Sequence, residues 1–251
     1  MQPVVLITGA AGGLGRALAR RFHQGNWRLA VTDLDAVGLA QLGHELPLAG
    51  STAADLRSAA SCREVVERCV GRIGRLDALV NAAGVWREGP VEEFSEEDFD
   101  LVMAANLKAP FFMCSAAIPH LKASRGCIVN VSSDAGHQGN RNAAAYCASK
   151  GGLTLFGKTL ALDLAPYGVR VNTVSPGDIA TPMLQFQAER YGNGDPQAYF
   201  AELLAKYPQG EAARFIQPEE VAELVYFLCQ PQAAAITGAD LAIDLGLSAG
   251  K

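Results

Sequence analysis

The sequence predicts an α/β fold, in which one domain holds a parallel, seven-stranded sheet with helices on both faces. Three observations support this class. Strand-like apolar runs alternate with amphipathic helical stretches along the chain, the order that crossover connections between parallel strands require. The length of 251 residues suits one domain with a large buried core. A glycine-rich turn joins the first strand-like run to the first helical stretch.

Short runs rich in β-branched and apolar residues predict the strands. In chain order these are 4–8, 28–33, 51–54 (the weakest pattern), 76–81, 126–132, 169–174 and 241–244. Apolar residues at helical spacing predict the helices between them. These are 13–25, 35–45, 58–73, 95–123, 146–166 and 217–229. The remaining irregular segment, 177–216, follows the end of a strand, and we interpret it as a lid that covers the substrate.

Composition excludes several function classes. The formal net charge of −5 and the absence of a basic cluster argue against a nucleic-acid partner. No apolar run of 18 residues predicts a membrane span, and the N-terminus lacks the basic region of a signal peptide. The six cysteines show neither CxxC pairing nor zinc spacing with the four histidines, so we expect reduced thiols, a cytoplasmic protein and no metal site.

The turn at 8–15 has the features of a dinucleotide site. Its glycines permit a tight turn and close approach of the backbone to a pyrophosphate, which the following helix N-terminus then faces. Asp33 ends the second strand, where a carboxylate can accept hydrogen bonds from both ribose hydroxyls and repel a 2′-phosphate. No Arg or Lys stands at 12, 32, 34 or 35, so NAD is favoured over NADP. The alternative interpretation of Asp33 is an N-cap for helix 35–45.

Tyr146 and Lys150 share one face of a predicted helix. At about 5 Å and an effective dielectric of about 20, the ammonium favours the phenolate by about 3 kcal/mol, which predicts a lowered pKa for Tyr146. Such a phenol suits general acid/base catalysis, and Ser133 could hold a substrate oxygen beside it. Taken alone the pair is weak evidence, because a surface tyrosine beside a solvated lysine has the same spacing.

An ordered set of motifs covers essentially the whole chain: TGAAGGLG at 8–15, Ala-Asp-Leu at 54–56, NAAG at 81–84, VNVSS at 129–133, Tyr146 with Lys150, and RVNTVSPG at 170–177. This set resembles the short-chain dehydrogenase/reductase family in its compact single-domain branch. The resemblance implies a Rossmann-type doubly wound sheet and a homotetramer. The sequence departs from the family pattern at Ala83, where a second Asn is usual, and at Leu245, where Gly is frequent.

The resemblance also implies roles for individual residues. Tyr146 would be the general acid/base, and Lys150 would lower its pKa and bind the nicotinamide ribose. Ser133, rather than Ser132, would hold the substrate oxygen, and Asn106 would support a water-linked proton relay. The residues expected to bind the cofactor are Gly9, Gly12, Gly13, Leu14, Gly15, Asp33, Leu34, Asp55, Leu56, Asn81, Ala82, Ala83, Gly84, Tyr146, Lys150, Pro176, Gly177, Ile179 and Thr181. Those expected to contact substrate are Ser133, Tyr146, His137 and Met183.

The function that follows is an NAD-dependent oxidoreductase, which transfers hydride between the nicotinamide and a secondary alcohol or its ketone. A polyol, a sugar or a hydroxy acid would suit the polar residues near the pocket. One rival is a 3-oxoacyl thioester reductase, which commonly uses NADPH, and Asp33 speaks against it. The other rival is a non-catalytic NAD-binding sensor, which would often lack the tyrosine or the lysine.

Overall fold

The structure, a computed structural model, describes residues 2–250. Its centre is one seven-stranded sheet in the order β3-β2-β1-β4-β5-β6-β7, and every neighbouring pair is parallel. The direction of the strand order therefore reverses between β1 and β4, where the crevice of a doubly wound fold lies. The strands are β1 (Val4–Thr8), β2 (Arg28–Asp33), β3 (Leu48–Ala53), β4 (Ala78–Asn81), β5 (Cys127–Val131), β6 (Arg170–Pro176) and β7 (Asp240–Ile243).

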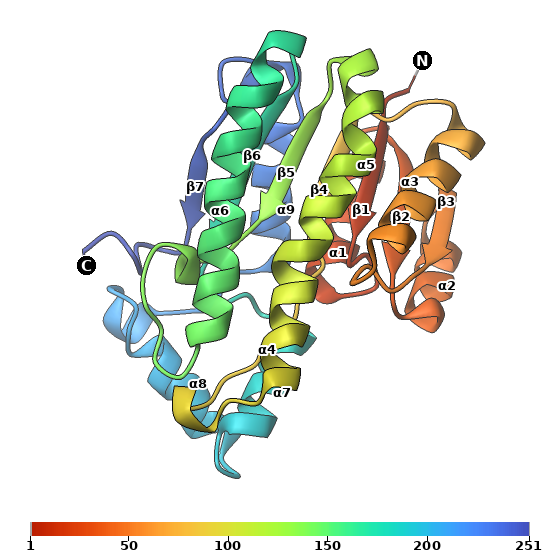
Figure 1. Ribbon diagram of the computed structural model, residues 1–251. Helices are drawn as coiled ribbons and strands as arrows, with labels where there is room; N and C mark the ends of the chain where they lie inside the picture. The colour runs from red at the N-terminus through yellow and green to blue at the C-terminus, as the bar shows by residue number, and fades with distance from the viewer. Residues whose placement is uncertain (1, 251) are drawn as a thin grey trace.

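Nine α-helices connect and surround these strands in residues 2–250 (Figure 1). They are α1 (Gly13–Gln24), α2 (Ala36–Glu45), α3 (Ala59–Ile73), α4 (Glu96–Met103), α5 (Ala109–Ser124), α6 (Ala144–Leu164), α7 (Pro182–Tyr191), α8 (Pro196–Leu204) and α9 (Pro218–Leu228). Short turns complete the list: the π turn η2 (Ala104–Lys108) and the 3₁₀ turns η1 (Val91–Glu93), η3 (Asp134–Gly136), η4 (Ala165–Tyr167), η5 (Gly210–Ala212) and η6 (Pro231–Ala233). The predicted α/β class with its parallel seven-stranded sheet is confirmed.

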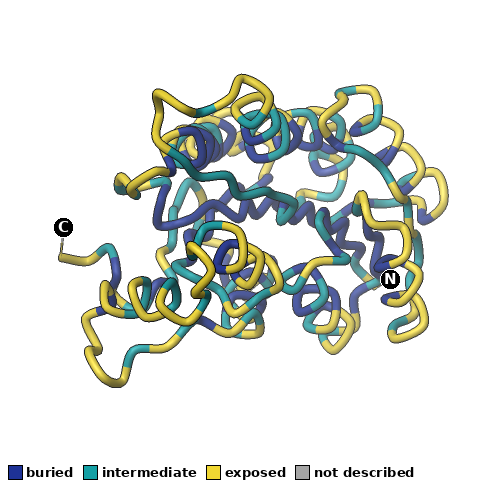
Figure 2. Tube along the Cα trace, turned by 90° about the horizontal axis from the view of Figure 1, so that it is seen from below, coloured by how far each residue is buried: buried dark blue, intermediate teal, exposed yellow. Residues whose placement is uncertain are grey.

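Two apolar cores hold the layers together. On one face of the sheet α1, α2 and α9 pack on Val5 and Ile7 of β1, and on the other face α3, α5 and α6 pack on Val4 and Leu6. Successive residues of a strand point to opposite faces, so a strand buried on both sides is apolar throughout. Figure 2 shows the buried strands between the two helix layers. Helices α4, α7 and α8 lie beyond the carboxyl ends of the strands (Figure 1).

The predicted helix 95–123 is one continuous stretch, Glu96–Ser124, but a π turn interrupts its α-helical hydrogen bonding at Ala104–Lys108. Asn106 lies in this turn, and its side chain bonds to the backbone N–H and C=O of Val85. A π turn inserts one extra residue into a helix and often marks a functional site. By length and composition this stretch could cross a membrane, with a mean hydropathy of 1.5 and 39% of the window buried within the domain.

The prediction that 177–216 is irregular was wrong, because α7 and α8 occupy much of it. Each helix begins with proline at its first turn, and Asp195 caps α8 by accepting from two backbone N–H groups. Both proline signals and the aspartate are visible in the sequence. The third strand was also misplaced, since β3 begins at Leu48 rather than at 51.

Candidate active site

The turn between β1 and α1 depends on its glycines. Gly9 has a left-handed φ of 69°, and a Cβ there would lie 2.8 Å from the backbone of Ala83. A Cβ on Gly15 would lie 2.0 Å from the Gly9 carbonyl oxygen. Gly12 precedes α1 without any side-chain cap, and the first turn of α1 has no acidic residue. The N–H groups at this helix start are therefore available to an anion, which fits a dinucleotide pyrophosphate.

A cavity of about 780 Å³ opens at the carboxyl ends of the strands. It extends from the end of β2, past the glycine turn, to the end of β5. Most residues expected to bind cofactor or substrate line it: Gly9, Gly12, Gly13, Leu14, Gly15, Asp33, Leu34, Asp55, Leu56, Ala82, Ala83, Gly84, Ser133, Tyr146, Lys150, Pro176, Gly177, Ile179, Thr181 and Met183. The structure therefore brings together residues that are up to 174 positions apart in sequence.

Three predicted site residues do not line the cavity. Asn81 is buried, and its amide donates to Asn130 Oδ1 at 2.9 Å, so its side chain joins β4 to β5. Asn106 is fully buried behind Gly84 and also donates to Ser149 Oγ. The expected substrate contact of His137 is not supported, because its Nε2 lies 3.1 Å from Asp240 Oδ2, outside the cavity lining.

Asp33 is held by backbone donors at the end of the cavity next to β2. Its Oδ2 accepts from the Ala11 N–H at 2.9 Å, and its Oδ1 accepts from the Asp35 N–H at 3.0 Å. Asp35 is the N-cap of α2, since it accepts from two N–H groups in the first turn. The alternative interpretation of Asp33 as the helix cap is therefore wrong, and Asp33 is left to face the cavity.

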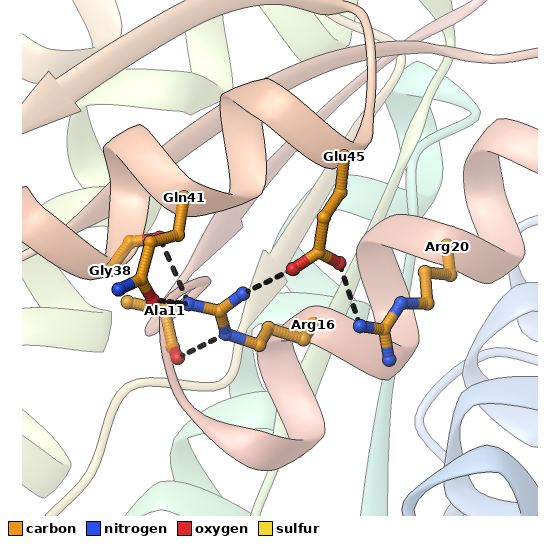
Figure 3. Close-up of polar contacts among 6 residues, drawn as sticks. All are labelled: Ala11, Arg16, Arg20, Gly38, Gln41 and Glu45. Carbon is orange, nitrogen blue, oxygen red and sulfur yellow. Dashed lines mark hydrogen bonds and ion pairs between the residues drawn. The ribbon is translucent and has the colours of Figure 1, made fainter.

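Arg16 is the first basic side chain of α1, and each of its three nitrogens has a partner (Figure 3). Its Nε donates to the Ala11 carbonyl oxygen at 2.9 Å, and one terminal nitrogen lies 2.9 Å from Glu45 Oε1. The other terminal nitrogen donates to the carbonyl oxygen of Gly38 and to the amide oxygen of Gln41. These bonds connect α1 to α2 and use four of the five N–H donors of the guanidinium.

Ser133, Tyr146 and Lys150 meet at the opposite end of the cavity. Ser133 follows β5, while Tyr146 and Lys150 lie on consecutive turns of α6 and are 9% and 5% exposed. Lys150 Nζ lies 5.6 Å from the centre of the Tyr146 ring and donates to the Val131 carbonyl oxygen at 3.0 Å. The helical spacing predicted from the sequence is confirmed, as is the side-by-side placement of the two groups.

The expected lowering of the Tyr146 pKa is wrong for the protein alone. Burial raises the pKa of Tyr146 above its ordinary value, and a hydrogen bond between Tyr146 and Ser133 opposes this only in part. Burial also lowers the pKa of Lys150 to about 8. Desolvation disfavours the charged form of each group, and here it outweighs the Coulomb attraction that sequence spacing alone suggested.

Sequence reasoning missed several polar residues in the cavity wall. Asp134 is 7% exposed and lines the cavity beside Ser133. Asp178 lines it from the loop after β6, and burial raises the pKa of Asp178 to about 6. Gln187 of α7 is also buried there. The direct adjacency of Asp134 to Ser133 was a usable signal, whereas Gln187 was hidden in a segment taken as irregular.

A glycine-turn cavity at the switch point of a doubly wound sheet, ending at a Ser, Tyr and Lys cluster, defines a nicotinamide-dependent oxidoreductase. Residues 9–248 match the family model described as enoyl-(acyl carrier protein) reductase. The chain is 40% identical to D-threitol dehydrogenase of Mycolicibacterium smegmatis, over 97% of this chain and 92% of that protein. It is 37% identical to 3-oxoacyl-(acyl-carrier-protein) reductase of Thermotoga maritima, over 97% of both. The chain belongs to the short-chain dehydrogenase/reductase family.

Solved structures agree with this assignment. A 3-ketoacyl-(acyl-carrier-protein) reductase from Brucella melitensis complexed with NADH superposes with a TM-score of 0.87 at 32% identity, covering 98% of each chain. An actinorhodin polyketide ketoreductase variant with NADPH superposes with a TM-score of 0.92 at 34% identity, covering 98% of this chain and 97% of that one. The protein is thus an alcohol dehydrogenase or ketoreductase that uses a nicotinamide cofactor.

Proposed function

We propose that the protein is an NAD-dependent dehydrogenase of a small, hydroxylated secondary alcohol, such as a polyol, a sugar or a hydroxy acid. The observation that carries the proposal is the cavity itself. It joins Asp33 at the adenosine end to Ser133, Tyr146 and Lys150 at the reactive end. The rival activity is reduction of a 3-oxoacyl thioester, which is the activity named for one of the similar proteins. The negative charge at the proposed adenosine end argues against this activity, because such reductases commonly use NADPH.

The preference for NAD rests on charge at that end. A 2′-phosphate would lie near the Asp33 carboxylate, which repels it, whereas ribose hydroxyls can donate to that carboxylate. Arg16 is engaged with Glu45, Gln41 and two carbonyl oxygens. Arg57, also in the cavity wall, forms an ion pair with Asp55 at 2.6 Å. Each basic group described here already has an acidic or carbonyl partner, which favours a cofactor without the extra phosphate.

The reactive end supports a proton transfer at the Tyr146 hydroxyl. In oxidation, Ser133 holds the substrate oxygen while Tyr146 removes its proton, and in reduction Tyr146 donates that proton. A bound nicotinamide supplies the hydride acceptor or donor and, when oxidised, a positive charge. With a pKa of about 8, Lys150 is mostly charged at pH 7, so it can stabilise the phenolate during transfer. Asn106, between Val85 and Ser149, suits the expected relay from Lys150.

Two further features belong to the same proposal. Helices α7 and α8 would act as the substrate lid, and Met183, Leu184 and Gln187 of α7 already line the cavity. A homotetramer is supported by large apolar side chains exposed on the outer helices, namely Phe111, Leu155 and Leu162. We also propose a cytoplasmic enzyme that binds neither nucleic acid nor membrane, in keeping with its net charge of −5 and its six free cysteines.

The test is NADH formation with polyols, sugars, hydroxy acids and simple secondary alcohols, with NAD and NADP in parallel. We expect turnover with NAD at least tenfold above that with NADP. Tyr146→Phe should lower kcat by more than 100-fold because the proton acceptor is lost, while the Kd for NADH measured by calorimetry stays within threefold. The matched control is Tyr167→Phe, which removes a hydroxyl from a half-exposed tyrosine distant from the cavity.

Three outcomes would contradict the proposal. Retention of more than a few per cent of activity by Tyr146→Phe would remove Tyr146 as the general acid/base. Preference for NADP would show that the charge argument at Asp33 fails. Reduction of a 3-oxoacyl thioester with NADPH, without oxidation of any small alcohol, would favour the rival reductase.

A further inference from the structure

Asp134 is a buried carboxylate that the proposed proton transfer does not use. It begins η3 directly after Ser133, is 7% exposed and lines the cavity at its reactive end. Ser133 Oγ donates to Asp134 Oδ1 at 2.7 Å, and Gln138 Nε2 donates to Oδ2 at 3.0 Å. Asn140 Nδ2 also donates to Oδ2 at 3.5 Å, and the three donors hold the carboxylate in one orientation. An oriented carboxylate therefore lies beside Ser133, the residue that would hold the reacting oxygen.

The position of this carboxylate is electrostatically unfavourable for the chemistry. Its negative charge adds to burial in raising the pKa of Tyr146 and that of Asp178. Among residues 2–250, no basic side chain forms an ion pair with Asp134. A buried charge that opposes phenolate formation and has no cation beside it needs a compensating partner, and hydroxyl donors from a ligand would supply one.

Geometry limits which ligand group can reach Asp134. A reacting hydroxyl bonded to Ser133 Oγ lies about 2.8 Å from it, and Asp134 Oδ1 lies 2.7 Å from the same Oγ atom. A substituent on the carbon next to the carbinol therefore comes within reach of the carboxylate. Ionised carboxylates only accept hydrogen bonds, and each oxygen has two lone pairs. Gln138 and Asn140 both donate to Oδ2, whereas Ser133 alone donates to Oδ1, which leaves one lone pair of Oδ1 for a ligand. The fitting substituent is a hydroxyl group, which donates.

We propose that Asp134 accepts a hydrogen bond from the hydroxyl adjacent to the reacting carbinol, and so makes vicinal diols, as found in polyols and sugars, the preferred substrate class. This inference rests on the proposed function. The cavity lining beside Tyr146 is compatible with such a substrate. Trp86 lines it with its ring centre 4.4 Å from that of Tyr146, and its indole N–H donates to Glu88 at 2.8 Å. This fixed aromatic surface can contact the carbon skeleton while the hydroxyls face Asp134.

The experiment compares two substrates that differ by one hydroxyl, meso-2,3-butanediol and 2-butanol, with NAD as cofactor. In the wild type we expect kcat/KM for the diol to exceed that for 2-butanol by at least tenfold. Asp134→Asn should lower the ratio of kcat/KM for the diol to that for 2-butanol by about tenfold, because the charged hydrogen bond is lost only with the diol. Any effect of the variant through Ser133 or Tyr146 acts on both substrates and cancels in this ratio. The Kd for NADH should not change, since Asp134 does not serve the cofactor.

Asp178→Asn is the matched control, because it neutralises another carboxylate of the same cavity that does not contact Ser133. It should leave the ratio of diol to 2-butanol within threefold of the wild-type ratio. If Asp134→Asn does not fold, a third substrate tests the inference in the wild-type enzyme. Its kcat/KM for 3-fluoro-2-butanol should resemble that for 2-butanol, because fluorine matches a hydroxyl in size but cannot donate.

Equal losses on both substrates in Asp134→Asn would overturn the inference, since they would mean that Asp134 only positions Ser133. Oxidation of 3-fluoro-2-butanol as efficiently as the diol would overturn it too. In either case the NAD-dependent dehydrogenase remains. If the wild type oxidises no small alcohol with NAD, the proposed function fails and the inference fails with it.

Discussion

Replacing the buried Lys150 with methionine should make the cofactor-free protein more stable at pH 7. Lys150 is 5% exposed, and its burial lowers the pKa from an ordinary 10.5 to about 8. The unfolded chain therefore holds a proton more tightly than the folded one, which costs about 3.3 kcal/mol of stability at pH 7. Loss of the hydrogen bond from Nζ to the Val131 carbonyl oxygen costs the variant about 1.5 kcal/mol. We expect a net gain of about 2 kcal/mol.

The pH dependence separates the ionic effect from changes in packing. A depressed lysine pKa contributes stability that is present above pH 10.5 and is lost as the pH falls through about 8. At pH 9.5 the cost of burying the charge has shrunk to about 1.4 kcal/mol, so the advantage of the variant should fall by about 2 kcal/mol between pH 7 and pH 9.5. The lost hydrogen bond and the altered packing are nearly independent of pH and cancel in this difference.

The assay is urea unfolding of both proteins at pH 7 and pH 9.5, followed by circular dichroism. Lys158→Met is the control, because Lys158 lies on the same helix but is exposed. Its effect on the free energy of unfolding should be small and the same at both pH values. If the difference between Lys150→Met and the wild type is constant to within 0.5 kcal/mol, burial does not depress the lysine pKa and the electrostatic account of the site is wrong.

Two further predictions concern stability. Burial raises the pKa of Asp178 from 3.8 to about 6, so its contribution is present below pH 3.8 and is lost as the pH rises through 6. Asp178→Asn should therefore be more stable than the wild type at pH 8, by up to about 3 kcal/mol. In thermal or urea unfolding, this difference in stability should disappear below pH 4, and a difference independent of pH would refute the prediction. Leu245 has a left-handed φ of 53°, which favours glycine. Leu245→Gly should be about 1 kcal/mol more stable than Leu245→Ala in urea unfolding, because both lose the leucine contacts but only glycine relieves the backbone strain. Equal stability of the two variants would exclude backbone strain at this position.

Local patterns were sufficient to predict the sheet and most of the cavity wall. The glycine turn, Asp33 and the Tyr146 to Lys150 spacing are each defined by residues close in sequence, and parallel strands bring their carboxyl ends to one edge. The signals that begin α7 and α8 were equally local, and the error there came from giving too little weight to Pro182, Asp195 and Pro196.

Other properties of the site depend on the assembled fold, which sequence spacing does not describe. Spacing placed Lys150 beside Tyr146 correctly, yet their pKa values follow from burial by residues that are distant in sequence. The same holds for His137, which is directed toward Asp240 at the start of β7. In the folded protein both partners of the pair resist ionisation, so a proton leaves Tyr146 readily only while Lys150 is charged and positive charge is close by. A bound oxidised nicotinamide would supply such a positive charge, which is consistent with the proposed oxidation of alcohols.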